Sequence, residues 1–241
     1  MAEDLNLKNS NTEIVTEDPR TWSLFKGLTE EEYIELASSV RILDFTRNQT
    51  VFRPGDSADR MYIVISGRMK ITQLMPDGRP QILYIYNPGD FVGGLNILSG
   101  DQYLYLGETL EDSKIGQIGK NIFSEFALTR VDSLIEILAK SFDRIRWAES
   151  LISRLSASNA EIKVAGLLIS LIDSYGIKKN DKIHLKLSIN REEMGSYAGL
   201  TRETMTRKLN EFRNKGYIGF KGHRTIVIKD LPALRRIIYL V

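Results

Sequence analysis

A run of guanidinium, carboxylate, hydroxyl and amide side chains near the C-terminal end has the types and spacing needed to read base pairs. A guanidinium can donate two hydrogen bonds to guanine O6 and N7, and a carboxylate can accept one from cytosine N4. A threonine can contact a phosphate or a thymine methyl group. The predicted DNA-contacting side chains of this run are Thr201, Arg202, Glu203, Thr206, Arg207 and Asn210.

Two short helices joined by a turn must position these side chains. Gly199 can adopt the left-handed conformation that ends the first helix, and the Thr201 hydroxyl can cap the second. In the second helix Met205, Leu209 and Phe212 recur at i, i+4 and i+7, which predicts a buried stripe opposite the polar face. The pattern is that of a helix-turn-helix.

Two β-prone runs follow, over 217–220 and 225–228, around a basic turn. They predict a hairpin wing in which Lys221 and Arg224 contact phosphates. His223 at the tip is expected to be a phosphate neighbour or a surface residue, and His184 an exposed strand residue. We expect no metal at either histidine. The alternative, a solvated helix face on a small α/β core, does not account for the agreement of turn, stripe, polar face and wing.

Charge is distributed unevenly along the 241 residues. From residue 163 onward there are 16 Lys and Arg against 7 Asp and Glu, a net charge of +9, whereas residues 1–162 carry 17 against 24, a net charge of −7. A basic C-terminal region is typical of a module that faces phosphates. The start of the chain lacks the features of a signal peptide, and no apolar run approaches the ~20 residues of a membrane span. We expect a cytoplasmic protein with no membrane partner.

The rest of the chain predicts an α+β protein. Polar residues at the start predict a mobile tail, or one that is ordered only where it packs on a neighbour. The stretch 22–40 predicts one or two short helices with Leu24, Leu28, Tyr33 and Leu36 in the core. Short apolar runs broken by glycine turns over 41–118 predict an antiparallel barrel or sandwich. The predicted runs are 61–66, 69–74, 82–86 and 114–118, and Pro-Gly-Asp occurs twice, at 54–56 and 88–90.

A long helix is predicted over 121–157, followed by a break at 156–159 that we interpret as a hinge. Asn159 is the expected N-cap of a further helix ending near Gly176. A heptad seam predicts a parallel dimer helix; its members are Leu134, Leu138, Ser141, Ile145, Ala148, Ile152 and Leu155. A second apolar face, with Ile135, Ile137, Phe142 and Trp147, indicates packing on the chain's own barrel. Both can hold together.

These features together resemble the cyclic-AMP receptor protein and fumarate-nitrate regulator (CRP/FNR) family, over residues 22–237. The stretch 199–207 is similar to the family's recognition-helix signature, and 154–161 resembles the fumarate-nitrate branch. The resemblance implies an N-terminal antiparallel β-roll like that of cyclic-nucleotide-binding domains, a long dimerisation helix and a C-terminal winged helix-turn-helix. It also implies a homodimer on a palindromic promoter site, control by a signal at the β-roll, and RNA polymerase as a partner. The domains expected are a tail (1–20), a β-roll sensor domain (21–128), a dimerisation helix (129–157) and a DNA-binding domain (158–241).

The departures from the family concern the signal. Gly94 stands where cyclic-AMP receptors carry the ribose-binding glutamate, and Tyr103-Leu104 where they carry the Arg-Ser pair that holds the cyclic phosphate. An anionic phosphate needs a cation or several donors, so cyclic AMP binding in the usual mode is not expected. The chain has no cysteine, which excludes disulfides and cysteine-held iron–sulfur clusters. No histidine lies in the predicted barrel to hold haem, and we expect no cofactor.

Aromatic residues remain around the predicted effector pocket. That pocket comprises Tyr84, Tyr86, Gly93, Gly94, Tyr103 and Tyr105. It suits an unidentified apolar or aromatic small molecule. In the alternative interpretation the rings simply fill the barrel, which suits a constitutively competent protein.

The sequence therefore predicts a homodimeric, sequence-specific DNA-binding transcription regulator with TGTGA-like half-sites. Arg202 decides the half-site, because the fumarate-nitrate branch has an apolar residue there and reads TTGAT-like sites. The alternative is a small-molecule sensor subunit that acts on a partner protein. We expect no enzyme, since the sequence shows no catalytic nucleophile–base pair, no metal-ligand spacing and no phosphate loop.

Overall fold

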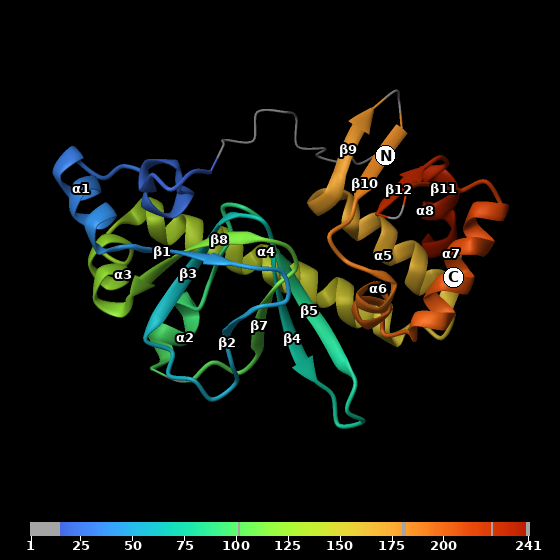
Figure 1. The fold of residues 1–241 in the computed structure, drawn as a ribbon, viewed down its shortest axis with the longest axis horizontal. Helices are drawn as coiled ribbons and strands as arrows, with labels where there is room; N and C mark the ends of the chain where they lie inside the picture. The colour runs from blue at the N-terminus through green and yellow to red at the C-terminus, as the bar shows by residue number, and fades with distance from the viewer. Residues whose placement is uncertain (1–14, 101, 180–181, 223, 240–241) are drawn as a thin grey trace. The chain divides into compact units, whose positions relative to one another are not determined.

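The computed structural model describes residues 15–100, 102–179, 182–222 and 224–239. These residues divide into two compact units (Figure 1). The first, which we call the roll unit, comprises residues 15–73 and 83–147, and the second, the reading unit, comprises residues 74–82 and 148–239. Within the described part of the chain, no helix is long and apolar enough to cross a membrane.

Two antiparallel sheets form the centre of the roll unit, with strand orders β1-β8-β3-β6 and β2-β7-β4-β5. The strands are β1 (Arg41–Phe45), β2 (Thr50–Phe52), β3 (Arg60–Ser66), β4 (Met69–Leu74), β5 (Pro80–Tyr86), β6 (Phe91–Val92), β7 (Leu106–Thr109) and β8 (Ser113–Gly119). The accompanying helices are η1 (Pro19–Thr21), η2 (Ser23–Phe25), α1 (Glu30–Ser39), α2 (Gly94–Ser99), α3 (Lys120–Phe126) and α4 (Val131–Ser156). The four predicted strands are confirmed as β3, β4, β5 and β8, and with them the α+β class.

The two Pro-Gly-Asp segments form the same turn. In each, the aspartate carboxylate accepts a hydrogen bond from the backbone N–H three residues earlier, at 2.8 Å for Asp56 and 2.9 Å for Asp90. The central glycines, Gly55 and Gly89, have φ values of 88° and 89°, a backbone conformation that residues with a side chain rarely adopt. The repeated sequence therefore forms the same aspartate-bonded turn at two places in the roll.

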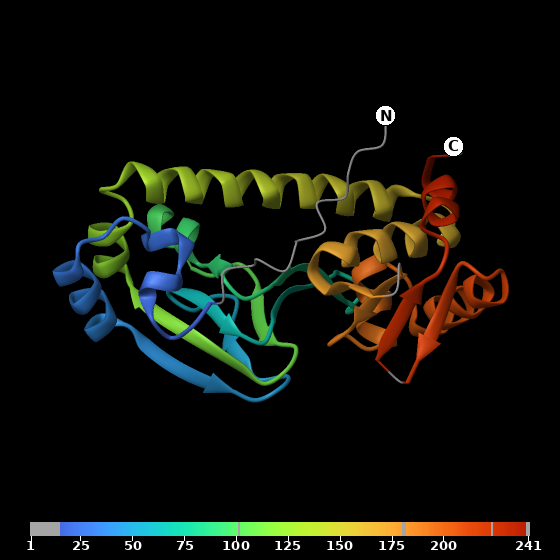
Figure 2. The same cartoon turned by 90° about the horizontal axis from the view of Figure 1, so that it is seen from above.

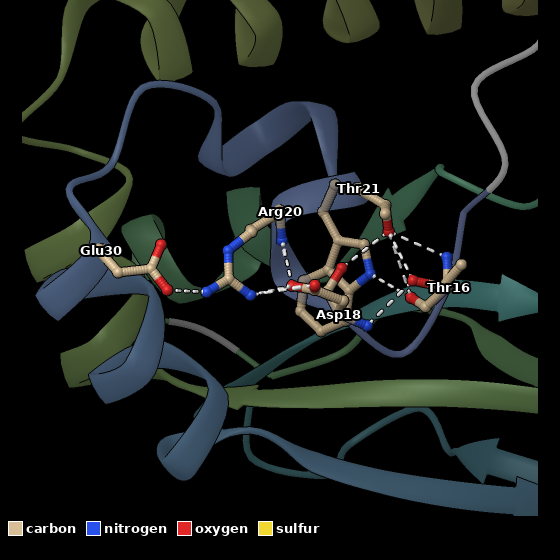
Figure 3. Close-up of polar contacts among 6 residues, drawn as sticks. Thr16, Asp18, Arg20, Thr21 and Glu30 are labelled. Atoms are coloured by element: carbon tan, nitrogen blue, oxygen red, sulfur yellow. Dashed lines mark hydrogen bonds and ion pairs between the residues drawn. The ribbon is translucent and has the colours of Figure 1, made fainter.

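Residues 16–20, which the sequence assigned to a mobile tail, belong to the roll unit and bond to its next residues (Figure 3). Asp18 caps η1 by accepting the Arg20 N–H at 3.0 Å, and the Arg20 guanidinium also pairs with Glu30 of α1. The Trp22 indole N–H donates to the Thr16 carbonyl at 2.8 Å, and Trp22 itself is buried. Ordered packing therefore begins before residue 20, because a buried indole needs a hydrogen-bond acceptor. The earlier part of the predicted tail, residues 1–14, lies outside the described residues.

The single helix predicted over 121–157 is instead two helices, α3 and α4. The Thr129 hydroxyl donates to the Glu125 carbonyl at 2.6 Å, so a side chain competes with the helical backbone at the junction. After this break α4 continues unbroken for 26 residues (Figure 2), a length of ~39 Å at 1.5 Å per residue. It ends at Ser156, which confirms the predicted interruption.

In the reading unit, Asn159 caps α5 (Ala160–Tyr175) by accepting the Glu161 N–H at 2.8 Å, as the sequence predicted. Later elements form a four-stranded sheet of order β11-β12-β10-β9 with three more helices. They are β9 (Gly176–Lys179), β10 (Lys182–Lys186), α6 (Arg191–Ala198), α7 (Arg202–Asn214), β11 (Ile218–Lys221), β12 (Thr225–Ile228) and α8 (Leu231–Tyr239). A strand was expected at His184, but its pairing with β9 in a hairpin and helix α8 were not predicted.

Candidate DNA interface

The turn between α6 and α7 is built as its sequence requires. Gly199 ends α6 with φ 65° and ψ 41°, and the Thr201 hydroxyl accepts the Thr204 N–H at 3.2 Å. A Cβ on Gly195 would lie 2.7 Å from the Leu200 carbonyl oxygen, so the two helices approach closely only because this residue is glycine. The predicted stripe of α7 is fully buried; its members are Met205, Leu209 and Phe212.

The polar face of α7 borders one open hollow. Its lining is Arg202, Glu203, Thr206, Arg207, Asn210, Glu211 and Asn214. The structure thus brings together five of the residues predicted to read DNA, while Thr201 serves as the cap of the same helix. Glu211 and Asn214 were missed, although Asn214 continues the 203–207–210 spacing by one further helical turn.

Two guanidinium groups and two carboxylates lie on this face, so its formal charges balance. The Arg207 Nη1 atom is 3.6 Å from Glu211 Oε1, and the Lys208 ammonium donates to Glu211 Oε2 at 2.6 Å. The hydrogen bond from Lys208 holds the pKa of the Glu211 carboxyl below its ordinary value, with smaller contributions from Arg207 and Lys215. Glu211 is therefore ionised at neutral pH, within ion-pair distance of the exposed Arg207 side chain.

Thr206 is half-buried at the edge of the hollow. Its hydroxyl donates to the Arg202 carbonyl at 2.8 Å, one helical turn earlier, so the hydroxyl proton is used within the helix. The side chain can still accept a hydrogen bond or contact a thymine methyl.

The predicted wing is present as the hairpin β11–β12, with Lys221 paired opposite Thr225. Lys221 and Arg224 are exposed, while His223 lies outside the described residues. The Arg191 and Arg213 guanidinium groups lie over the Phe220 ring, at 4.9 and 5.6 Å from its centroid. This pair of cation–π contacts fixes the base of the wing against α6 and α7, and no spacing in the sequence predicted it.

His184 lies on β10, as predicted, but is half-buried rather than exposed. It pairs with Val227 of β12 and with Ile177 of β9, so neighbours on both sides cover part of the ring. In the portion of the chain that the structure describes, no group of three or more histidine, aspartate or glutamate side chains is placed to hold a metal ion.

Helix α4 exposes a long apolar face. Of the predicted seam, Leu138, Ile145 and Ile152 are more than half exposed, whereas Ser141 and Leu155 are half-buried. Leu134 and Ala148 are also exposed. Ile137 packs into the roll core, and the Trp147 indole N–H donates to the Leu83 carbonyl at 3.1 Å, as expected of the second face. Ile135 and Phe142 do not follow that expectation, because both are exposed.

The rings of the predicted effector pocket fill the roll. Tyr103 stacks on Phe52 at 4.3 Å between centroids, and its hydroxyl donates to the Arg60 carbonyl. Tyr84 packs at 4.6 Å from Tyr86, and Tyr105 packs against the same core. Burial raises the pKa of Tyr86 to about 12, and it raises the pKa of Tyr84 and Tyr103 further. The Tyr86 hydroxyl is buried and has no hydrogen-bond partner among the described residues.

Gly93 borders the Tyr103 ring, because a Cβ built on it would lie 3.3 Å from Tyr103 Cε1, whereas Gly94 faces Phe123 instead. Gly93 is the N-cap of α2 with φ 95°, and Gly94 lines a small cavity beside Lys140 and Arg144 of α4. These two cations were missed by the sequence analysis, which considered only the cassette itself. Lys140 is paired with Asp90 at 2.7 Å, and the Arg144 guanidinium lies 5.7 Å from the Tyr86 ring centroid.

Comparison with known proteins agrees with both units. Residues 42–130 match the cyclic nucleotide-binding domain family, and residues 162–237 match the Crp-like helix-turn-helix domain family. The chain is 26% identical over 213 residues to a CRP-like cAMP-activated global transcriptional regulator of Mycobacterium tuberculosis, covering 88% of this chain and 95% of that one. It is 27% identical to the nitrogen fixation regulation protein FixK of Azorhizobium caulinodans, covering 90% and 88%. The fold is similar to that of FixK2 from Bradyrhizobium japonicum, with a TM-score of 0.73 at 24% identity over 82% of this chain and 96% of that one.

Proposed function

Because the chain belongs to the CRP/FNR family of DNA-binding transcription regulators, we propose that it acts as a homodimer on an inverted-repeat promoter site with TGTGA-like half-sites. The family consists of transcription factors rather than enzymes. The observation that carries the proposal is the face of α7, where two guanidinium groups, two carboxylates, two amides and a threonine border one open hollow.

The half-site follows from the chemistry of that face. Arg202 and Arg207 each offer the two parallel donors that match guanine O6 and N7, and Glu203 offers an acceptor for cytosine N4 on the opposite strand. The methyl of Thr206 is proposed to contact the thymine between them. Lys221 and Arg224 of the wing are proposed to contact phosphates, which adds affinity but no sequence preference.

We propose that a second copy of the chain covers the apolar face of α4. Leu138, Ile145 and Ile152 recur every seven residues and are exposed, and Ile135 and Phe142 flank them. A seven-residue repeat brings two helices together along their whole length. Two-fold symmetry then places the two copies of α7 about one duplex turn apart, ~34 Å, which requires an inverted repeat. RNA polymerase is the proposed partner at the promoter.

The signal is proposed to differ from cyclic AMP. Gly94 brings no carboxylate for a ribose, and Lys140 is already paired with Asp90. The stacked rings leave the roll interior filled, which favours a regulator that is competent without an effector. Any small-molecule effector of the roll is proposed to use the unpartnered Tyr86 hydroxyl, because that buried group gains a hydrogen bond by binding it.

Selection from random duplexes tests the proposal. The enriched sites should be inverted repeats with guanines at the positions read by Arg202 and Arg207, and affinity should fall steeply with salt because phosphate contacts release counterions. Enriched sites without those guanines would refute the reading code. No preference among duplexes, with a flat salt dependence, would favour the alternative of a sensor subunit that acts on a partner protein.

A further inference from the structure

The four-stranded sheet of the reading unit has one apolar and one basic face. Its inner residues are Ile183, Leu185, Ile218, Ile226 and Ile228, all buried. Helix α5 contacts β9 and β10 on this side, and α7 contacts β11. Because successive side chains of a strand point to opposite faces, the residues between these buried ones form the outer face of the sheet.

Lysines dominate that outer face. Lys179 of β9 pairs directly opposite Lys182 of β10, and Lys229 follows Ile228, which is the partner of Ile183, so it continues the same row across the sheet. In a second row, Thr225 lies between Lys186 and Lys221. We call these five residues, Lys179, Lys182, Lys186, Lys221 and Lys229, the lysine face; all are exposed. The four strands contain no aspartate or glutamate.

Lys229 shows how the side chains lie on this face. A Cβ built on Gly219 of β11 would lie 2.8 Å from the Lys229 Cε atom and 3.5 Å from its Nζ atom. The methylene stem therefore crosses the glycine backbone and carries the ammonium group out to solvent. Gly219 leaves room for a lysine from the neighbouring strand.

Such an arrangement is unfavourable without a partner of opposite charge. Like charges directly opposite each other on neighbouring strands destabilise a sheet, and within the described residues none of the five lysines has an ion-pair partner. Lysines on an edge strand also prevent edge-to-edge aggregation. That role accounts for Lys179 on the edge strand β9 but not for Lys182 and Lys186 on the interior strand β10.

The reading face of α7 adds a second argument. Its arginines and glutamates balance, so it contributes little net attraction to a polyanion. Much of the excess positive charge of the C-terminal region lies on the sheet instead. The lysine face is also continuous with the wing, because Lys221 belongs to both.

We propose that the lysine face binds the phosphate backbone of the duplex that flanks the half-site. Lysine suits this task, because a point charge on a flexible stem attracts phosphates without reading bases. Duplex DNA presents one charge per ~1.7 Å of its axis, which can match two rows of ammonium groups. The proposal rests on the proposed function and extends it to the length of DNA that the protein holds.

Two duplexes with the same selected inverted repeat test the proposal by titration at several salt concentrations. One ends at the half-sites, and the other extends by about one helical turn, ~10 bp, on each side. The variants are Lys182→Gln and the double variant Lys182→Gln/Lys229→Gln. Lys178→Gln is the matched control, because Lys178 lies on β9 opposite Ile183 and belongs to the other face of the sheet.

Wild type should bind the extended duplex more tightly than the short one, and Lys178→Gln should keep this gain. Each lysine removed should lower the salt slope on the extended duplex by about 0.9. The factor by which that lysine raises the affinity should therefore change about 3.5-fold between 50 and 200 mM salt. For the double variant, the ratio of wild-type affinity to variant affinity should change about 12-fold over the same salt range. On the short duplex the variants should bind like wild type.

Three results would overturn the proposal: no gain from the flanks in wild type, an unchanged gain in the double variant, or equal losses on both duplexes. A double variant that keeps the gain but fails to activate transcription with RNA polymerase would assign the face to an acidic protein surface instead. Wild type that gains from flanks but does not prefer the selected repeat over a scrambled one would refute the proposed function and leave the lysine face standing.

Discussion

Replacement of Gly199 by alanine tests whether α4 controls the geometry of the helix-turn-helix. Gly199 has φ 65°, and a Cβ at this position would lie 2.4 Å from the Leu155 Cδ2 atom near the end of α4. Alanine therefore meets two obstacles, the left-handed backbone and the leucine methyl. Gly216 is the matched control, because its φ is 80° but a Cβ there would meet nothing within 4 Å.

The backbone cost is common to both substitutions and amounts to roughly 1–2 kcal/mol. The gain from a less flexible unfolded chain, about 0.4–1 kcal/mol, is also common and cancels in the comparison. Only Gly199→Ala must in addition displace Leu155 from its rotamer, at about 0.5–1.5 kcal/mol. We expect Gly199→Ala to destabilise the reading unit by about 1 kcal/mol more than Gly216→Ala does.

Hydrogen exchange of the amides in α6 and α7 measures the opening free energy of this unit. Tryptophan fluorescence is the internal control. The protein's two tryptophans, Trp22 and Trp147, belong to the roll unit, so neither glycine substitution should change their emission. In a Leu155→Ala background the two glycine substitutions should have equal effects. If Gly199→Ala and Gly216→Ala already agree in the wild-type background, Leu155 does not constrain the turn and the reasoning is refuted.

Four further predictions follow from the two units. Arg207→Ala should cost ~1–3 kcal/mol of binding free energy and relax one guanine position, whereas Lys221→Ala or Arg224→Ala should weaken binding to all duplexes alike and flatten the salt slope; selection and titration distinguish the two outcomes. Ile145→Asp/Ile152→Asp should yield monomers in analytical ultracentrifugation with much weaker binding to the inverted repeat, and a double variant that stays dimeric would place the interface elsewhere. Calorimetry with millimolar cyclic AMP should show no specific heat; saturable micromolar binding would mean that Lys140 or Arg144 completes an unforeseen phosphate site. Tyr86→Phe removes a buried hydroxyl without a partner and should raise stability by ~1 kcal/mol. Burial raises the pKa of Tyr86 in the folded protein to about 12, whereas a tyrosine in the unfolded chain ionises near ~10. Ionisation of the unfolded chain therefore lowers the free energy of unfolding as pH rises above ~10. The Tyr86→Phe variant lacks this group and should lose less stability than wild type in alkaline unfolding experiments.

Local signals in the sequence predicted much of the fold. Gly199, Thr201 and Asn159 were identified because helix termini depend on the chemistry of one or two residues, and each has the expected role in the structure. The junction between α3 and α4 was missed because it depends on a threonine that bonds back to the helix and on tertiary packing of Phe123 and Phe126. Neither leaves a periodic signal, so the apolar pattern read as one continuous helix.

The face of a helix was harder to predict than the helix itself. Ile135 and Phe142 were placed toward the roll, yet both are exposed, while Ser141 turns toward the small cavity beside Gly94. A shift of one position in a 4-3 pattern rotates the buried stripe by one residue, about 100° at 3.6 residues per turn, and an apolar sequence supports either choice. Only the packing of Ile137 and Trp147 against the roll decides which face remains open.

Base reading and attraction to DNA occupy different surfaces of the reading unit, and this separation explains which parts the sequence revealed. The reading side chains follow one another along a single helix and its cap, so their spacing is visible within the ten residues 201–210. The lysine face is assembled from residues between 179 and 229, on three strands and directly after the fourth, and only the sheet register brings them together. The net charge of +9 in the C-terminal region predicted a basic surface but not where on the fold that surface lies. Because the face of α7 that lines the hollow is balanced in charge, a substitution on this face should change which sequence is bound. A substitution on the lysine face should instead change how strongly a duplex with flanking DNA is held, whatever its sequence.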